Sequence, residues 1–206
     1  MLERVVPRSV EDSVRRRDVA EAVWRVVRRE GLEGASVRAV AGEAGLSMGS
    51  LRHYFPSQSE LHVFAMRLVT DRIRARVEGL PATTDPRRWA LRVIEEMLPL
   101  DTDRRAESEV WLAFTARALV DPALRALRDE GWDLLREVCH NLVRRIADAG
   151  ALAADLDPDV EAARLHALVD GLLVHGVLRP SRADPATLRQ VLAQHLDGLV
   201  QPSVVE

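Results

Sequence analysis

Residues 36–61, SVRAVAGEAGLSMGSLRHYFPSQSEL, contain a helical pattern that stops at a glycine and then resumes. Apolar residues in its first part are spaced i, i+3, i+4 and i+7, the spacing of one helix face. They are Val37, Val40, Ala41 and Ala44. Gly45 then suits the left-handed backbone that ends a helix, and Ser47 is placed to cap the next one. The stretch therefore predicts two short helices joined by a sharp turn.

The second of these helices has a polar outer face. Leu51 and Phe55 form its inward edge, so the intervening side chains point outward. These outward residues are Met48, Ser50, Arg52, His53 and Tyr54. A helix, a sharp turn and a helix with a polar and partly cationic face is the helix-turn-helix geometry that fits a DNA major groove. A structural helical hairpin has the same pattern, and this stretch alone favours neither reading.

The run from about residue 19 to residue 61 resembles the DNA-binding domain of the TetR family of transcriptional repressors. The resemblance is carried by Ala22-Val23, Gly31, Ser36-Val37-Arg38, Ala41 to Ser47, Gly49-Ser50-Leu51, Tyr54-Phe55 and Ser57 to Leu61. Two positions depart from the family pattern, which commonly has Tyr at Arg52 and Lys at Gln58. The resemblance implies a double-stranded DNA operator as partner, a small-molecule effector and a homodimer. It leaves the operator sequence open, together with the effector, the regulated genes and the choice between repressor and activator.

The DNA-binding residues implied by this resemblance lie in both helices and just beyond them. Arg38 matches the base-contacting position of the family, and we expect the remaining residues to share base and phosphate contacts. The complete predicted set is Arg38, Ser47, Met48, Gly49, Ser50, Arg52, His53, Tyr54 and Gln58. Arg15 to Arg17 lie just before the first helix, where they either contact phosphates or simply face solvent.

The segment Gly45-Leu46-Ser47-Met48-Gly49 also fits G-x-S-x-G, the nucleophile elbow of α/β-hydrolases. That motif needs a preceding strand, whereas a helical pattern precedes it here, so an esterase is only an alternative reading. A helical partner-binding protein without DNA binding is another. We predict no catalytic residue, no cofactor and no metal site. His166 and Asp170 stand at i, i+4, a spacing that suits a metal but is more often a simple hydrogen bond.

Composition predicts an all-α protein. The 206 residues are 47% hydrophobic but only 4% aromatic, and no alternating run of strand length stands out. Residues 1–80 contain 14 Arg and 11 acidic residues, whereas residues 81–206 contain 15 Arg and 21 acidic residues. A basic front and an acidic rear fit a protein that presents one end to nucleic acid. We expect a DNA-binding domain at 1–60 and a ligand-binding and dimerisation domain at 61–206.

A cytoplasmic location is expected, with no membrane span. Cys139 is the only cysteine, so nothing indicates an oxidising compartment, and the N-terminus is too charged for a signal peptide. The most apolar stretch, residues 165–178, is interrupted by two histidines and an aspartate.

Helix boundaries in the rear half are marked by Asp-Pro pairs at 85–86, 121–122, 157–158 and 184–185, because Asp caps a helix and Pro suits its first turn. We predict rear helices at 86–98, 104–119, 122–148, 158–178 and 185–200. In the front half we predict an arm over residues 1–14, a first helix that Gly31 stops, and a long helix from the Ser57-Gln58-Ser59-Glu60 capping box to about Leu80. The total is nine helices.

The last two predicted helices are apolar on more than one side and must be covered on more than one side. Either they form the core of one chain or they pair with their copies in a two-fold interface, and we predict the interface. Its residues are Leu168, Leu172, Val177, Leu188, Leu192 and Leu196. The rear half also resembles the C-terminal domain of the TetR branch related to regulators of betaine synthesis from choline. This second resemblance is carried by Trp111 to Phe114, Ala116 to Ala118, Asp121-Pro122 and Leu168 to Leu172.

Large side chains of the rear half are candidates for an effector pocket. The predicted ligand-binding residues are Trp89, Met97, Trp111, Phe114 and Trp132. In a chain so poor in aromatic residues, the same side chains equally suit core packing, and the sequence leaves this choice open.

Overall fold

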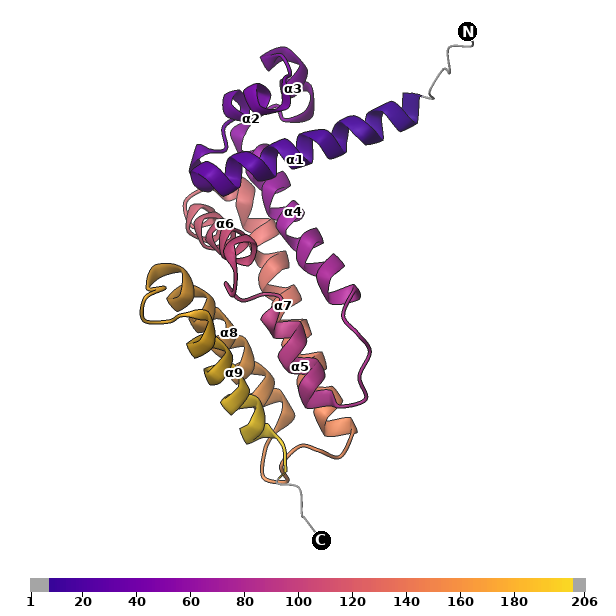
Figure 1. Cartoon of the computed structure of the whole chain (residues 1–206), viewed down its shortest axis with the longest axis vertical. Helices are drawn as coiled ribbons and strands as arrows, with labels where there is room; N and C mark the ends of the chain where they lie inside the picture. Colours follow the sequence, from indigo (N-terminus) through magenta and orange to yellow (C-terminus); the bar gives the residue numbers. More distant parts are fainter. Residues whose placement is uncertain (1–7, 202–206) are drawn as a thin grey trace. The chain divides into compact units, whose positions relative to one another are not determined.

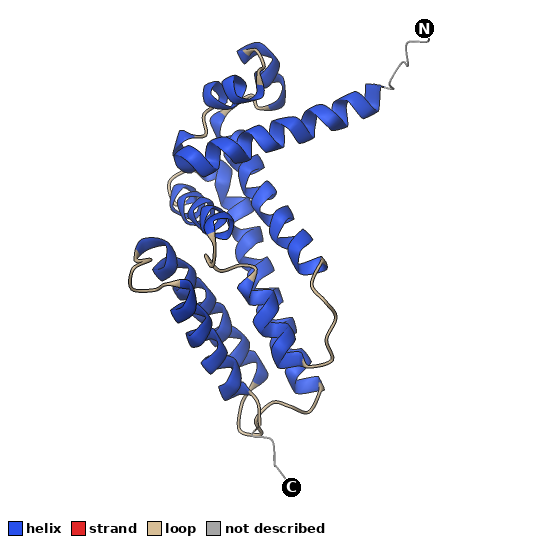
Figure 2. Cartoon of the chain, in the orientation of Figure 1, coloured by secondary structure: helices blue, strands red, loops and turns tan. Residues whose placement is uncertain are grey.

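The computed structural model describes residues 8–201, with residues 8–16 described for their backbone alone. Within this range all regular secondary structure is helical (Figure 2). One isolated antiparallel β-bridge joins Leu152 and Val200. The helices labelled in Figure 1 are α1 (Arg8–Gly34), α2 (Val37–Ala44), α3 (Met48–Tyr54), α4 (Gln58–Glu78), α5 (Pro86–Glu95), α6 (Thr102–Ala118), α7 (Pro122–Asp148), α8 (Pro158–Leu178) and α9 (Pro185–Leu199). The prediction of nine helices is confirmed over the described residues.

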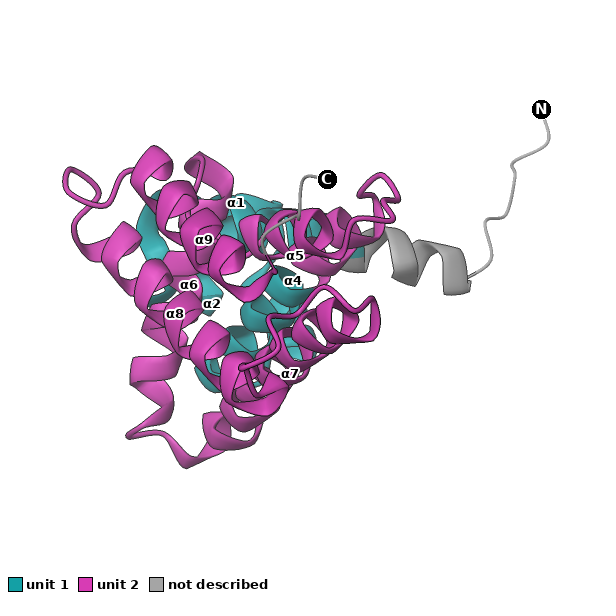
Figure 3. Cartoon of the chain, turned by 90° about the horizontal axis from the view of Figure 1, so that it is seen from below, with its two compact units in different colours: residues 1–70 teal, residues 71–206 magenta. Residues whose placement is uncertain are grey.

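The chain divides into two compact units, Met1–Thr70 and Asp71–Glu206 (Figure 3). The division falls inside α4, ten residues after the boundary expected at 60/61. Its position has a packing reason, because Leu61, Ala65 and Val69 on the first half of α4 are buried. These side chains add the start of α4 to the core of unit 1.

In unit 1, local capping produces the predicted corner. Ser36 caps α2 by accepting a hydrogen bond from Ala39 N at 3.1 Å, and Ser47 caps α3 by accepting one from Ser50 N at 3.0 Å. Gly45 between them has φ 65°, the left-handed conformation that glycine adopts without steric cost. Helix α2 packs against both α3 and α1, whose core residues include Val23 and Val26.

The N-terminal arm predicted over residues 1–14 is wrong for residues 8–14, which are helical. This segment lacks glycine and proline after Pro7, so nothing local stops α1 from extending toward the N-terminus. Residues 1–7 lie outside the described part of the chain. At the other end of α1 the prediction holds, because Gly31 has φ 73° and ψ 179°, a break in an otherwise helical run.

In unit 2, all four Asp-Pro pairs begin helices as predicted. Asp85, Asp121, Asp157 and Asp184 each accept a hydrogen bond from a backbone N–H of the first turn, and a proline follows each of them. The bounds of α7 and α8 match the prediction. Helix α5 ends at Glu95 rather than at 98, because the residue before Pro99 disfavours helical backbone. Helix α6 begins at Thr102 rather than at 104, because Asp101 caps it by accepting a hydrogen bond from Arg104 N at 2.8 Å.

One hydrophobic core joins α5, α7, α8 and α9 of unit 2. Fully buried side chains from each helix meet in it, among them Ile94, Val143, Leu165 and Leu192. Helix α6 packs against α7 and α8 and completes the bundle. No helix in the described part of the chain combines the length and apolar character that a membrane span needs.

Candidate nucleic-acid interface and effector pocket

The outer edge of α3 is exposed in unit 1. Met48, Gly49, Ser50, Arg52 and His53 are exposed, whereas Leu51 is fully buried and holds the helix to the core. Met48 is an exposed large apolar residue, which folding of this unit does not explain. Tyr54 is half-buried at the end of the helix. The edge therefore offers hydroxyl, imidazole and guanidinium groups to solvent.

Arg38 lies one residue inside the N-terminus of α2 and is exposed. It borders a shallow surface depression that also includes Arg29, Glu43 and Ser36. Hydrogen bonds to Arg25 at 2.6 Å and Arg29 at 3.0 Å hold the pKa of Glu43 below its usual value. This carboxylate is thus matched by two guanidinium groups, and its negative charge adds little net repulsion toward a polyanion.

Two predicted DNA-binding residues have internal roles as well. The Ser47 hydroxyl accepts from Ser50 N and lies 2.9 Å from the Ser50 hydroxyl. Gln58 differs more from expectation, because it is half-buried and its amide nitrogen donates to Ala35 O at 2.8 Å and lies 2.9 Å from His62 Nε2. These contacts assign the Gln58 amide to holding α4 against the loop before α2 rather than to a surface contact.

The G-x-S-x-G motif lies between two helices, and Ser47 caps the second of them. A nucleophile elbow needs a strand before the serine, so the esterase reading is wrong. No group of three or more His, Cys, Asp or Glu side chains in the described residues is arranged to hold a metal ion. His166 and Asp170 lie near each other, with Nε2 and Oδ2 3.6 Å apart.

Unit 2 contains a pocket of about 470 Å³ between α6, α7 and α8. Helix α6 contributes Trp111, Leu112 and Thr115; α7 contributes Arg128, Asp129 and Trp132; α8 contributes His166, Asp170, Leu173 and Val174. We call this the α6–α8 pocket. Its volume lies within the range of small-molecule sites, roughly 300–1,000 Å³.

Of the five side chains predicted to bind a ligand, Trp111 and Trp132 line the α6–α8 pocket. Phe114 is fully buried in the interior, and Trp89 and Met97 pack against the core, with the Arg145 guanidinium 5.4 Å from the centre of the Trp89 ring. The sequence pattern missed the polar residues of the pocket, including Thr115 and Asp129. The spacing of His166 and Asp170 on α8 was the available signal.

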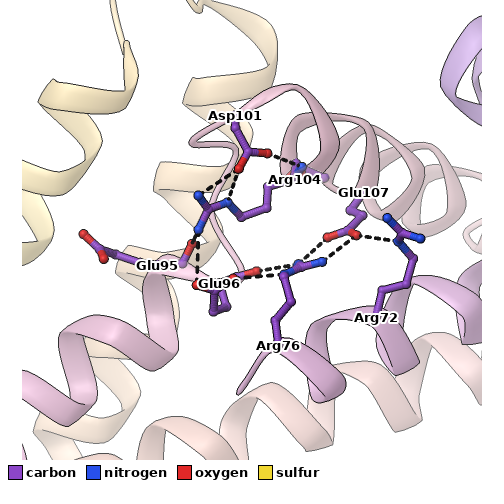
Figure 4. Close-up of polar contacts among 8 residues, drawn as sticks. Arg72, Arg76, Glu95, Glu96, Asp101, Arg104 and Glu107 are labelled. Carbon is purple, nitrogen blue, oxygen red and sulfur yellow. Dashed lines mark hydrogen bonds and ion pairs between the residues drawn. The ribbon is translucent and has the colours of Figure 1, made fainter. Parts of the chain in front are cut away.

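A network of buried charge connects α4 to α6 inside unit 2 (Figure 4). Glu107 on α6 has a side chain that is only 3% exposed, and it accepts hydrogen bonds from Arg72 at 3.0 Å and from Arg76 at 2.5 and 2.8 Å. Arg76 also donates to Glu96 at 2.9 Å, and Arg104 lies between Glu96 and Asp101. One turn after Glu107, the same helix contributes Trp111 to the α6–α8 pocket.

Comparison with known proteins agrees with this geometry. Residues 19–63 match the model for bacterial regulatory proteins of the tetR family, and residues 86–201 match the model for the BetI-type transcriptional repressor C-terminal domain. The chain belongs to the TetR family of transcriptional regulators. It is a ligand-responsive DNA-binding regulator with a BetI-type C-terminal domain, and the family is not enzymatic.

TetR-family relatives match nearly the whole chain. The HTH-type transcriptional regulator PksA of Bacillus subtilis is 39% identical over 196 residues, which cover 94% of each chain. A regulator from Rhodococcus sp. Rha1 is 31% identical with a TM-score of 0.76, covering 90% of this chain and 98% of that one. A regulator from Saccharomonospora viridis, solved in complex with choline, is 26% identical with a TM-score of 0.78, covering 93% of this chain and 100% of that one.

In this TetR regulator, four of the six residues predicted for a dimer interface are buried in the core of a single chain: Leu172, Leu188, Leu192 and Leu196. A side chain already covered by its own chain has no surface to offer a second copy. Leu168 and Val177 are half-buried. Any interface made by α8 and α9 therefore uses the remaining exposed side chains of these helices.

Proposed function

We propose that this regulator is a homodimeric repressor that binds a palindromic operator through α3 and Arg38 and releases it when a small molecule occupies the α6–α8 pocket. The exposed polar edge of α3, on a helix whose Leu51 is fixed in the core, is the observation that carries the DNA-binding part. Recognition helices of this type enter the major groove, and a two-fold dimer places two of them about one helical turn apart.

Contacts in the groove are assigned by side-chain chemistry. Arg38 reads a base edge, since a guanidinium forms paired hydrogen bonds with guanine. Ser50, Arg52 and His53 share further base and phosphate contacts from the exposed edge of α3. Ser47 and Gly49 bring the N-terminus of α3 close to the phosphate backbone, where its first N–H groups favour negative charge. Gln58 is left out of this set because its amide is used inside unit 1.

Operator binding is tested with the DNA that flanks the gene of this protein, using fluorescence anisotropy over a salt series. Each phosphate contacted steepens the slope of log affinity against log salt by about 0.9. Arg38→Ala should weaken operator binding by about 1–3 kcal/mol and weaken random DNA far less. Arg67→Ala, an exposed arginine on α4, is the matched control. If Arg38→Ala lowers the affinity for operator and for random DNA equally, Arg38 does not read a base.

The proposed dimer face is the exposed stripe of α8. Ala163, Ala167 and Gly171 recur on one side of the helix, with the exposed Val160 and Leu178 at its ends. Small residues at this spacing let two helices approach closely, and the open space beside Gly171 leaves room for a second copy.

Sedimentation velocity tests this face. Wild-type protein should sediment as a dimer, and Ala167→Glu should shift it toward monomer, because two carboxylates would meet across the two-fold axis. Arg88→Glu changes an exposed charge on α5 and should leave the dimer intact. A dimer that tolerates Ala167→Glu would place the interface elsewhere.

The effector part is supported by the family and by the pocket. The Saccharomonospora viridis relative has been solved with choline, and the α6–α8 pocket of this chain lies among helices of the matching BetI-type domain. Release follows if the effector binds the DNA-incompetent form better than the DNA-bound form, since a ligand shifts an equilibrium only by its differential affinity.

A further inference from the structure

The α6–α8 pocket has a wall whose chemistry limits what it can hold. Trp132 on α7 is 51% exposed, and its ring lies 5.1 Å from the imidazole of His166, tilted by 51°. A half-exposed tryptophan leaves a large apolar area in water, which folding alone would avoid. An aromatic face at the mouth of a pocket is a contact surface for an apolar or cationic ligand.

The Trp111 ring of α6 packs closely against a glycine of α7. A Cβ built on Gly131 of α7 would lie 2.7 Å from two ring carbons of Trp111, closer than any real Cβ contact. Only glycine therefore lets the ring occupy this position beside α7. The pocket consequently has two tryptophans, one of them fixed by close packing.

The carboxylates of the pocket are not equivalent. Asp129 Oδ1 accepts hydrogen bonds from Arg128 at 2.6 and 2.9 Å, so these two charges neutralise each other. Within the described residues, the only basic group within ion-pair distance of Asp170 is His166, and the 3.6 Å between Nε2 and Oδ2 is too long for a hydrogen bond. Burial raises the pKa of Asp170, although His166 partly opposes this. Unlike Asp129, the Asp170 carboxylate therefore has no guanidinium partner in the described residues, and a ligand cation beside it would offset the desolvation that burial imposes.

Two polar atoms on the wall have no hydrogen-bond partner within the described residues. They are the hydroxyl oxygen of Thr115 and Nε2 of His166, and both are buried. The His166 residue is only 6% exposed. A buried polar atom without a hydrogen-bond partner carries a free-energy cost. A ligand group that bonds to either atom would remove that cost, which favours binding.

From these contacts we propose that the α6–α8 pocket selects a drug-sized organic monocation that carries both an aromatic group and a hydroxyl or similar hydrogen-bonding group. Asp170 and the tryptophan faces take the cationic centre, and Thr115 with His166 takes the hydroxyl. The volume of about 470 Å³ exceeds what a small quaternary ammonium such as choline would fill. Organic anions are rejected, because they would meet the carboxylate of Asp170. The proposal rests on the proposed function for its regulatory meaning, but binding itself is measurable without DNA.

Isothermal titration of the full chain with matched probes tests the proposal. The cation is benzyldimethyl(2-hydroxyethyl)ammonium, which we call benzylcholine. Its neutral carbon analogue is 3,3-dimethyl-4-phenylbutan-1-ol, its analogue without hydroxyl is benzylethyldimethylammonium, and its small counterpart is choline. Benzylcholine should bind about tenfold more tightly than each of the other three, which corresponds to about 1.4 kcal/mol for each missing interaction. Equal affinity for benzylcholine and the neutral analogue would overturn the proposal.

Variants assign each part of the ligand to a side chain. Asp170→Asn should abolish the preference for benzylcholine over the neutral analogue, whereas Asp133→Asn, which removes an exposed carboxylate on α7, should preserve it. Thr115→Val should abolish the preference for benzylcholine over the analogue without hydroxyl and should leave the cation preference unchanged. If Asp170→Asn fails to fold, Trp132→Leu serves instead and should weaken binding of the three cations more than binding of the neutral alcohol. An unchanged cation preference in Asp170→Asn would reject the assignment.

The outcomes separate the two proposals. A chain that binds operator but gives no heat with benzylcholine refutes the ligand class and leaves DNA binding intact. A chain that binds benzylcholine selectively but ignores operator refutes the proposed repressor and supports the ligand class.

Discussion

Gly42 and Gly45 lie three residues apart, but their backbones differ. Gly42 is inside α2 and exposed, and a Cβ added to it would meet nothing within 4 Å, whereas Gly45 has φ 65°. Gly42→Ala should stabilise the protein by about 0.5–1 kcal/mol, since alanine loses less conformational entropy in a helix. Gly45→Ala should destabilise it by about 1–2 kcal/mol through left-handed strain. Thermal unfolding followed by circular dichroism measures both, and a Gly45→Ala protein as stable as wild type would contradict the capping role.

Cys139 is fully buried on α7. Burial, together with the charge of Asp170, raises the pKa of its thiol to about 12. At mildly alkaline pH the reactive thiolate should be more than about a thousandfold scarcer than for an ordinary cysteine with a pKa near 8.5. Iodoacetamide should therefore label the folded chain very slowly and the guanidinium-unfolded chain at the rate of a free thiol. Mass spectrometry measures the labelling rate. Rapid labelling of the folded protein would show that α7 opens readily.

At the scale of elements, α6 combines a charged anchor and a pocket wall. Glu107 accepts hydrogen bonds from two arginines of α4, and its side chain has almost no exposure. Arg105 of the same helix donates to the last carbonyls of α8, Gly176 O at 2.9 Å and Val177 O at 2.8 Å. These contacts fix α6 to both the end of α4 and the end of α8. If a ligand displaces Trp111, α6 therefore cannot shift without also moving the ends of α4 and α8.

Glu107→Gln should destabilise the chain by about 3 kcal/mol, because it removes the charge of a nearly buried carboxylate that pairs with both Arg72 and Arg76. Glu109→Gln is the control on the same helix. Its side chain is 45% exposed and pairs with Arg105 at 3.0 Å, so its loss should cost less than about 1 kcal/mol. Chemical denaturation compares the two variants. Equal effects would mean that the buried network contributes no more than a surface ion pair.

At the scale of the whole molecule, operator and effector must be thermodynamically linked if the proposed function holds. If benzylcholine lowers the affinity for operator by a given factor, saturating operator must lower the affinity for benzylcholine by the same factor. We expect this factor to be about 5–150, the usual range of allosteric coupling. Anisotropy of labelled operator measures one side and calorimetry in the presence of operator measures the other. Unequal factors would mean that benzylcholine also binds at a second site.

The sequence determined the local structure. Asp-Pro pairs, the serine caps and Gly45 fix where helices begin and end through contacts within one turn, so nearest-neighbour chemistry suffices to predict α2, α3, α7 and α8. The exposed edge of α3 was predictable for the same reason, since Leu51 and Phe55 define the inward side and the rest must face out. The local signal failed over residues 8–14, where local breakers are absent, and it misplaced the end of α5 and the start of α6 by two or three residues.

Tertiary structure alone decided which side chains meet. Trp111 lines the pocket and Phe114 does not, although both lie on α6, because Gly131 of α7 opens space for one ring and the core encloses the other. Likewise, Leu188 and Leu192 make an apolar stripe that suits either a core or an interface, and only the packing of α9 on α5 and α8 assigns them to the core. Amphipathic spacing gives a helix a buried side, but the partner that buries it comes from distant segments whose approach depends on the volume of every residue between them.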